Sequence, residues 1–295
     1  MIFLPFPLIS FHYSLPILQH LTLFPHLFSL FLPATKVNVM DEKKRPVILI
    51  TNDDGAFSKG IKTLMNVASK FGDVVVFAPD KVQSGTSNAI STKTPILSSK
   101  LYSQDGVTVY SSSGTPTDCV KLAFYSLFRD VKPDLLLSGI NHGSNTSVNT
   151  IYSGTMGAAL EGCINHVPSI AFSLCDYSWN ADFSNAIPFI EKIIDFVLRD
   201  SLSFGTCLNV NFPKGEVKGI KVCRQANAYW DEEFDLRKGK YGFNEYWLVG
   251  NFVNREPLSR DTDMWAIDNG YASVVPIKID MSDMDSIKYL KTKIE

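Results

Sequence analysis

The fold of this chain is decided by one short stretch, which reads Pro46-Val47-Ile48-Leu49-Ile50-Thr51-Asn52-Asp53-Asp54-Gly55. Its apolar residues 47–50 are too few for a helix and too continuous for a strand with one wet face. They therefore predict the buried central strand of a parallel sheet. Ligands of such sheets bind beyond the carboxyl ends of the strands, and Asp53 and Asp54 stand at that position.

Two adjacent carboxylates have a definite electrostatic consequence. Each raises the pKa of the other, and the pair repels an anionic ligand unless a cation lies between them. A divalent metal ion is therefore the first hypothesis for this site. Residues 52–55 are also of types that favour turns, so an ordinary polar turn is the alternative interpretation of this stretch alone.

The composition of the chain limits the classes of function. Its 295 residues can bury a sizeable core and could form one large α/β domain or two small ones. The 28 basic and 30 acidic residues leave a formal charge of −2, which argues against binding to a nucleic-acid duplex. Its five cysteines are dispersed without C-x-x-C spacing and predict free thiols of a reducing compartment, most simply the cytoplasm: Cys119, Cys163, Cys175, Cys207 and Cys223.

The first 40 residues differ from the rest of the chain. Residues 1–35 contain no Asp, Glu, Lys or Arg, and five prolines interrupt this Phe/Leu-rich segment. A regular spanning helix does not fit it, and a signal peptide would have a basic start that is missing here. We expect residues 1–40 to be an apolar extension without activity, either a targeting segment or a spurious upstream start. Organelle targeting stays open, and no membrane contact is expected for the folded domain, residues 41–295.

Beyond residue 55, apolar segments alternate between helical and strand-like patterns. Helices are predicted at residues 61–71, 116–127, 153–161, 184–198 and 285–294, and strands at 73–78, 107–110, 135–137, 169–174 and 271–279. Residues 226–260 are instead short strands and turns rich in aromatics. We interpret this region as an appended β-hairpin used for packing or assembly, with stacking of a nucleobase as the alternative.

Polar residues gather where the predicted strands end. Ser84 lies in a hydroxyl-rich loop after the second strand, and Asn141 follows the strand at 135–137. Ser153, Gly154 and Thr155 begin a helix whose exposed backbone N–H groups could bind a phosphate, although Ser153 could be a plain N-cap. Thr115, Pro116 and Asp118 form a capping box, which explains them structurally.

Missing motifs narrow the chemistry further. Only His142 and His166 lie within the predicted folded body, which excludes H-E-x-x-H zinc proteases and phosphatases that use two histidines. Neither G-x-G-x-x-G after the first strand nor G-x-x-x-x-G-K-[ST] is present. Dinucleotide binding and P-loop hydrolysis are therefore disfavoured.

Five motifs occur in an order that resembles the SurE family of metal-dependent phosphatases, which are 5′/3′-nucleotidases: 52–55, 78–88, 114–119, 138–141 and 152–155. The resemblance covers about residues 46–279. It implies a Rossmann-like three-layer α/β/α sandwich with an extended hairpin, hydrolysis of nucleoside monophosphates, and homodimers or homotetramers. It also implies one Mg²⁺ or Mn²⁺ per subunit, with Asp53, Asp54, Ser84 and Asn141 as ligands, and a phosphate pocket lined by Asn145, Ser153, Gly154 and Thr155.

The residues themselves agree with that ligand set. Two carboxylates, a hydroxyl and an amide are hard oxygen donors, which suit Mg²⁺ or Mn²⁺. The chain departs from the family at Lys59, where proline is common, at His142, which fills a variable position, and in residues 1–40. A receiver-like signalling domain is disfavoured because Ser111-Ser112-Ser113 stands where its acceptor aspartate would be. A catalytically inactive nucleotide-binding or assembly protein of the same fold remains the alternative.

Overall fold

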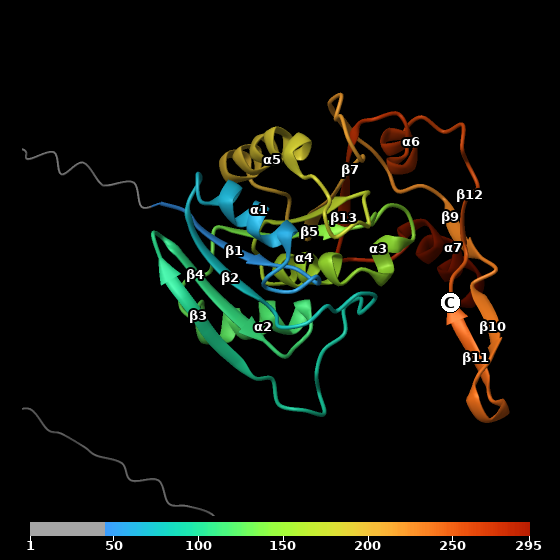
Figure 1. Ribbon diagram of the computed structural model, residues 1–295. Helices are drawn as coiled ribbons and strands as arrows, with labels where there is room; N and C mark the ends of the chain where they lie inside the picture. The colour runs from blue at the N-terminus through green and yellow to red at the C-terminus, as the bar shows by residue number, and fades with distance from the viewer. Residues whose placement is uncertain (1–44) are drawn as a thin grey trace, which may run out of the picture. The chain divides into compact units, whose positions relative to one another are not determined.

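The computed structural model describes residues 45–295, and these build a nine-stranded sheet with the order β3-β4-β2-β1-β5-β6-β7-β13-β8 (Figure 1). The strands are β1 Val47–Thr51, β2 Asp73–Pro79, β3 Ser98–Gln104, β4 Val107–Ser112, β5 Leu135–His142, β6 Ser169–Leu174, β7 Thr206–Phe212, β8 Ile220–Val222 and β13 Ala272–Lys278. The helices are α1 Lys59–Ala68, α2 Pro116–Ser126, α3 Asn149–Tyr152, α4 Gly154–Ile164, α5 Ile187–Asp200, α6 Asp263–Asp268 and α7 Met284–Ile294.

The predicted central strand is confirmed. β1 pairs in parallel with β2 on one side and with β5 on the other. The chain first builds outward from β1 through β2, and it then crosses back to place β5 on the opposite side. This reversal makes the carboxyl ends of β1 and β5 a topological switch point, which is where open α/β sheets bind ligands. The residues that follow these two strands are therefore brought to one crevice by the fold.

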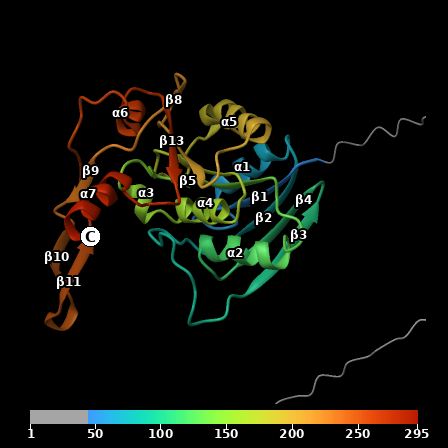
Figure 2. The same ribbon diagram turned by 180° about the vertical axis from the view of Figure 1, so that it is seen from behind.

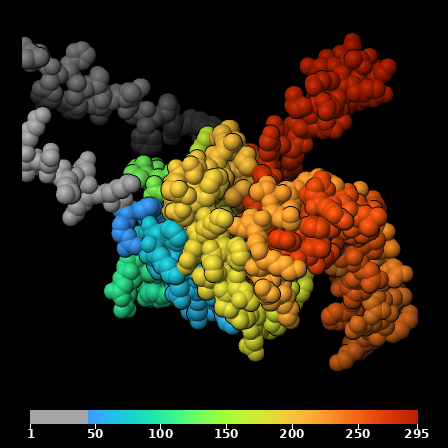
Figure 3. Space-filling view, turned by 90° about the horizontal axis from the view of Figure 1, so that it is seen from above, coloured from blue at the N-terminus to red at the C-terminus, as the bar shows by residue number. Residues whose placement is uncertain are grey.

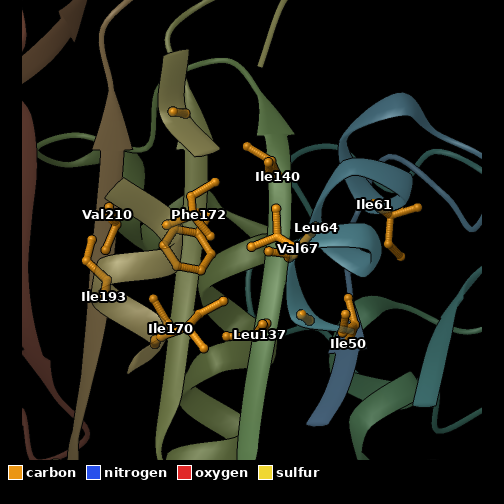
Figure 4. Close-up of a cluster of buried hydrophobic side chains, with 14 of the residues drawn as sticks. Ile50, Ile61, Leu64, Val67, Leu137, Ile140, Ile170, Phe172, Ile193 and Val210 are labelled. Carbon is orange, nitrogen blue, oxygen red and sulfur yellow. The ribbon is translucent and has the colours of Figure 1, made fainter. Parts of the chain in front are cut away.

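Helices cover both faces of the sheet, which gives the expected three layers (Figure 1). On one face, α1 and α5 pack with alternate strand residues, among them Ile50 and Leu137 (Figure 4). On the other face, α2 packs on the intervening residues Leu49 and Leu136, and α4 lies beside it (Figure 2). Because β1 is buried on both faces, its sequence is continuously apolar rather than alternating.

The helix termini are set by local sequence. The capping box of α2 is present, with the Thr115 hydroxyl accepting from the Asp118 N–H and Pro116 in the first turn. Ser153 is the N-cap of α4, as predicted. Helix α1 ends at Ala68, earlier than the predicted end at residue 71. Gly72 lies close to the backbone of Pro46. A Cβ atom at residue 72 would be only 2.2 Å from the Pro46 carbonyl oxygen, so glycine is required there.

The predicted hairpin region contains two small antiparallel pairs. β9 Ala228–Asp231 pairs with β12 Asn251–Asn254, and β10 Phe234–Lys238 pairs with β11 Asn244–Leu248. Figure 3 shows these residues, in orange at the right, projecting beside the yellow residues of α5 and the loop that precedes it. The expected extension at residues 1–40 lies outside the described residues. Within residues 45–295, no helix is both long and apolar enough to cross a membrane.

Candidate functional site

The turn after β1 is held in shape by Asn52. Its amide Nδ2 donates to the Gly55 carbonyl at 3.1 Å and to the Ser58 hydroxyl at 2.9 Å, and its Oδ1 accepts from the Gly55 N–H at 3.2 Å. Gly55 has a φ of +95°, a conformation that strains any residue with a Cβ atom. The turn that Asn52-Asp53-Asp54-Gly55 predicts is therefore real, and it fixes the direction of both carboxylates.

Asp53 is buried against the start of α4. The Thr155 hydroxyl donates to Asp53 Oδ1 at 2.7 Å, and Asp53 is only 5% exposed. A Cβ atom on Gly154 would lie 3.2 Å from the Cβ atom of Asp53 and 2.8 Å from the Thr86 hydroxyl. Only glycine allows the N-terminus of α4 to approach the carboxylate this closely. Three of the predicted site residues, Asp53, Gly154 and Thr155, thus meet directly.

Burial has a clear electrostatic effect on this pair. Loss of solvent, followed by repulsion from Asp54, raises the pKa of Asp53 to about 6, although the Thr155 hydroxyl acts in the opposite direction. Loss of solvent also raises the pKa of Asp54, against the backbone N–H and the charge of His142. Among the residues that the structure describes, neither carboxylate forms a salt bridge. Asp53, which is buried, and Asp54, which is half-buried, are therefore held together without a full positive countercharge.

Asp54 is linked to the end of β5. The backbone N–H of His142 donates to Asp54 Oδ2 at 3.1 Å. The preceding residue, Asn141, is 9% exposed, and its amide Nδ2 donates to the Gly143 carbonyl at 3.0 Å. This bond leaves the Asn141 carbonyl oxygen Oδ1 as the atom that can bind a ligand.

Ser84 reaches the site through its neighbour. The Gln83 N–H donates to the Asp53 carbonyl at 2.7 Å, so the loop that carries Ser84 begins at the acidic turn. The same loop is tied to the start of α4, because the Ser87 N–H donates to the Tyr152 carbonyl at 3.0 Å. Ser84 itself is exposed.

Comparison with known proteins identifies the family. The model of the family described as survival protein SurE matches residues 48–232. A 5′-nucleotidase SurE of Flavobacterium johnsoniae is 50% identical over 256 residues, which cover 85% of this chain and 97% of that protein. A 5′-nucleotidase SurE of Bacteroides fragilis is 45% identical over 251 residues, covering 84% and 98%.

This chain belongs to the SurE family. The crystal structure of the SurE protein of Aquifex aeolicus superposes with a TM-score of 0.72 at 37% identity, and the match covers 83% of this chain and all of that one. The shared fold is therefore the Rossmann-like α/β fold expected from the sequence.

The SurE residues expected to bind a metal pass a chemical test of fit. Within residues 45–295 there is no group of three or more His, Cys, Asp or Glu side chains that could hold a metal ion. A cation at Asp53 and Asp54 must therefore draw further ligands from neutral oxygens, and the Ser84 hydroxyl and the Asn141 amide are of that kind. Oxygen-only ligands and two uncompensated carboxylates suit Mg²⁺ or Mn²⁺.

Asn145, expected in the phosphate pocket of a SurE protein, is held in a buried polar network. Its Nδ2 donates to the Ser173 hydroxyl at 2.8 Å, and its backbone N–H donates to Asn211 Oδ1 at 2.8 Å. Asn209 Nδ2 donates to the Asn145 carbonyl at 2.8 Å, and Asn211 Nδ2 donates to Asn209 Oδ1 at 2.9 Å. The sequence reasoning missed Asn209 and Asn211, although two asparagines at alternate positions of an apolar strand were the available signal.

Asp263 is a second residue that the sequence reasoning missed. This carboxylate has 0% exposure and accepts from the backbone N–H groups of Ser147, at 2.8 Å, and Ala226, at 3.0 Å. The Ser147 hydroxyl also donates to the Ala226 carbonyl at 2.7 Å. Residue 147 lies in the loop that carries Asn145, and residue 226 begins the hairpin region. Asp263 therefore joins the site loop to the base of the hairpin.

Proposed function

We propose that this chain is a metal-dependent phosphatase that hydrolyses nucleoside 5′- and 3′-monophosphates to nucleoside and phosphate. The observation that carries the proposal is the buried carboxylate of Asp53, bonded to Thr155 at the start of α4 and adjacent to Asp54. The names of the similar SurE proteins from two bacteria, 5′-nucleotidase, support the substrate class.

Asp53, Asp54, Ser84 and Asn141 would hold one Mg²⁺ or Mn²⁺ per subunit. Such an ion supplies positive charge that polarises a phosphoryl oxygen and lowers the pKa of water. The side chains have separate tasks in this arrangement. Thr155 fixes the Asp53 carboxylate, and the His142 N–H fixes Asp54. Asn141 Oδ1 is left to face the ion because its Nδ2 is bonded to Gly143.

The start of α4 would bind the phosphate. Helix N-termini attract anions through free N–H groups and the helix dipole, and α4 is 11 residues long. Ser153 already accepts from the Met156 N–H, so it shapes the first turn, while Gly154 lets the phosphate approach the backbone. Charge that builds on the phosphoryl oxygens is then stabilised by fixed dipoles that need no reorganisation. Asn145 would shape the far wall of this pocket through its buried network.

We further propose that the active domain comprises residues 41–295 and assembles as a homodimer or homotetramer in a reducing compartment such as the cytoplasm. Every residue of β10 and β11 is exposed, including Phe234, Leu236, Tyr246 and Leu248. Apolar patches of this kind mark interaction surfaces. The five cysteines are free in the structure, which suits a reducing environment.

Phosphate release from AMP, 3′-AMP, GMP and a generic aryl phosphate, with Mn²⁺ and with EDTA, tests the function. We expect release from the nucleotides with Mn²⁺ and none with EDTA. Binding of nucleotides without any release would favour the alternative, a catalytically inactive nucleotide-binding protein of this fold. Faster release from the aryl phosphate than from every nucleotide would contradict the substrate class.

A further inference from the structure

The loop after β6, residues 175–183, brings two exposed aromatic side chains to the edge of the sheet that carries the site. Trp179 is 68% exposed and Tyr177 is 72% exposed, so neither is required to fill the core. The loop begins next to the end of β5, because Leu174 is the strand partner of His142. The aromatic rings therefore stand beside the residues that follow Asn141.

His142 connects Trp179 to the acidic pair. Its backbone N–H donates to Asp54 Oδ2 at 3.1 Å, while its ring lies 5.9 Å from the ring of Trp179. The imidazole is fixed from two sides, since it packs edge-on against the buried Phe183 at 5.1 Å and its Nδ1 lies 2.9 Å from the Ser178 carbonyl. One residue thus links the Asp54 carboxylate to an exposed indole.

The loop that carries these rings is held in place. Lys59 Nζ donates to the Ala181 carbonyl at 2.6 Å, and the Ala181 N–H donates to the Ser178 carbonyl at 3.0 Å. The Ser178 N–H donates to Asp176 Oδ1 at 3.0 Å, which fixes the other end of the turn. These bonds hold the backbone of the loop before any ligand binds, which reduces the entropy cost of ordering the loop on binding.

The two aromatic rings have different surroundings. A Cβ atom on Gly143 would lie 2.4 Å from Cε1 of Tyr177, so the tyrosine ring lies directly over the backbone of the site loop. This contact with the Gly143 backbone accounts for the position of the Tyr177 ring. The Trp179 ring instead lies beside the His142 ring, with the ring centres 5.9 Å apart, and it is 68% exposed.

We propose that Trp179 stacks on the nucleobase of the substrate, an assignment that rests on the proposed function. A nucleoside monophosphate whose phosphate lies at the start of α4, beside an ion held by Asp53 and Asp54, would extend away from the sheet edge, and Trp179 would offer it a flat apolar surface there. Every base has a π-face, so stacking tolerates all bases, and the larger purines gain more contact than pyrimidines. The hairpin aromatics are less suited, since Trp230 is half-buried with its Nε1 bonded to Asn149.

Steady-state kinetics of Trp179→Ala test the assignment with two substrates, AMP and glycerol 2-phosphate, which has no base. We expect KM for AMP to rise about tenfold while kcat/KM for glycerol 2-phosphate stays unchanged. Trp179→Phe should recover most of the affinity for AMP. Tyr125→Ala is the matched control, because Tyr125 is 70% exposed on the outer side of α2, and it should behave like the unaltered protein.

Two results would overturn the stacking role: an unchanged KM for AMP in Trp179→Ala, or an equal loss for both substrates. A binding measurement separates this proposal from the proposed function. AMP should quench tryptophan fluorescence of the unaltered protein in Mg²⁺ within the first turnover, and Trp179→Phe should remove that quenching. Quenching at Trp179 in the presence of Mg²⁺ without any hydrolysis would refute the nucleotidase proposal and support the stacking one. Hydrolysis of AMP with equal quenching in Trp179→Phe would do the reverse.

Discussion

The edge of the sheet at β1 and β5 and the hairpin β10–β11 distribute their residues in opposite ways. At the sheet edge, charged and amide side chains such as Asp53 and Asn145 are buried. In the hairpin, apolar side chains such as Phe234 and Leu248 are more than half exposed. Both arrangements are costly in an isolated subunit, because buried charge loses hydration and exposed apolar surface orders water.

The difference between the two regions shows what each is able to bind. Buried carboxylates without a countercharge gain stability from a cation, whereas an exposed apolar face gains stability from another apolar surface. Alternation along the strands sharpens this contrast in the hairpin, because Phe234, Leu236, Tyr246 and Leu248 share one face. The other face carries Asp235, Arg237 and Glu245 together with Trp247, whose ring lies beneath the Arg237 guanidinium. The predictions below separate the two regions, from the largest expected effect on turnover to the smallest.

Asp53→Asn should produce the largest loss of activity. The substitution keeps size and turn propensity but replaces a strong metal ligand with a weaker one, so turnover should fall by at least about 10³-fold. The metal-free protein should be as stable as the unaltered one or more stable, because repulsion from Asp54 is removed. Thermal melting with and without Mn²⁺ and turnover of AMP measure both effects.

Asp130→Asn is the control for this substitution, since Asp130 is exposed. It should leave both turnover and stabilisation by Mn²⁺ unchanged. A folded Asp53→Asn protein that keeps near-normal turnover and is still stabilised by Mn²⁺ would remove Asp53 from the metal site.

Asp263→Ala should break the connection between the site loop and the base of the hairpin. It leaves the buried N–H groups of Ser147 and Ala226 without their acceptor, which should lower the free energy of unfolding by about 2–4 kcal/mol. Turnover at a temperature where the protein stays folded should fall about tenfold, because a loosened loop positions Asn145 poorly. Urea unfolding and kcat measure these effects.

Asp268→Ala is the control, since Asp268 lies in the same helix but is exposed. It should change neither the free energy of unfolding nor kcat, and equal losses in both variants would show that the effect belongs to α6 as a whole.

The sequence predicted the parts of the site that are local and missed those that depend on distant residues. Asp53 and Asp54 were predictable because a strand end and a turn are both written in ten consecutive residues. The bond from Thr155 to Asp53 joins residues 102 positions apart, and that from Ser147 to Asp263 joins residues 116 apart. No local pattern encodes such pairs. The resemblance implied that Thr155 lines the phosphate pocket, and the structure adds a hydrogen bond from its hydroxyl to Asp53 that the sequence did not predict.

The same limit applies to the elements of the fold. The apolar strands β1, β2, β5 and β6 and the helix α2, with its capping box, were predicted, because their own residues determine them. Strand β7 was not predicted, although it is buried, because two asparagines interrupt its apolar residues. Strand β3 was missed because all seven of its residues are exposed, so it carries no pattern of burial. The four-residue helix α3 and the short strand β8 are too brief for periodicity to show.

Protons should compete with the metal at Asp53. The pKa of this carboxyl is raised from 3.8 to about 6, so it gains a proton as the pH falls through about 6. Affinity for Mn²⁺ should therefore be about tenfold weaker at pH 5 than at pH 7. Calorimetric titration with Mn²⁺ at the two pH values measures this change. A tenfold change that persists in Asp53→Asn would assign the proton to another group.

Stability of the metal-free protein should change with pH in the opposite direction. Because the folded-state pKa of Asp53 lies above its unfolded value, the folded state binds this proton more tightly, and the group's contribution to stability increases as the pH falls from about 6 towards about 4. Its size is on the order of 2 kcal/mol. Urea unfolding in EDTA should show this gain in the unaltered protein and its loss in Asp53→Asn, so an identical pH profile in the two proteins would contradict the assignment.

Substitutions in the hairpin should have the smallest effect on turnover. Leu236 and Tyr246 are cross-strand partners on the apolar face, and replacing both with serine removes apolar surface without disturbing the core. Self-association measured by sedimentation should weaken, while turnover per subunit should stay within about twofold, because the pair makes no contact with the acidic turn. The matched control replaces Arg237 and Glu245, the cross-strand partners on the opposite face, with serine.

If both double variants weaken association equally, the hairpin acts through its own stability rather than through its apolar face. If the apolar variant instead loses turnover as severely as Asp53→Asn, the contrast drawn between the two regions is wrong, and the hairpin belongs to the site.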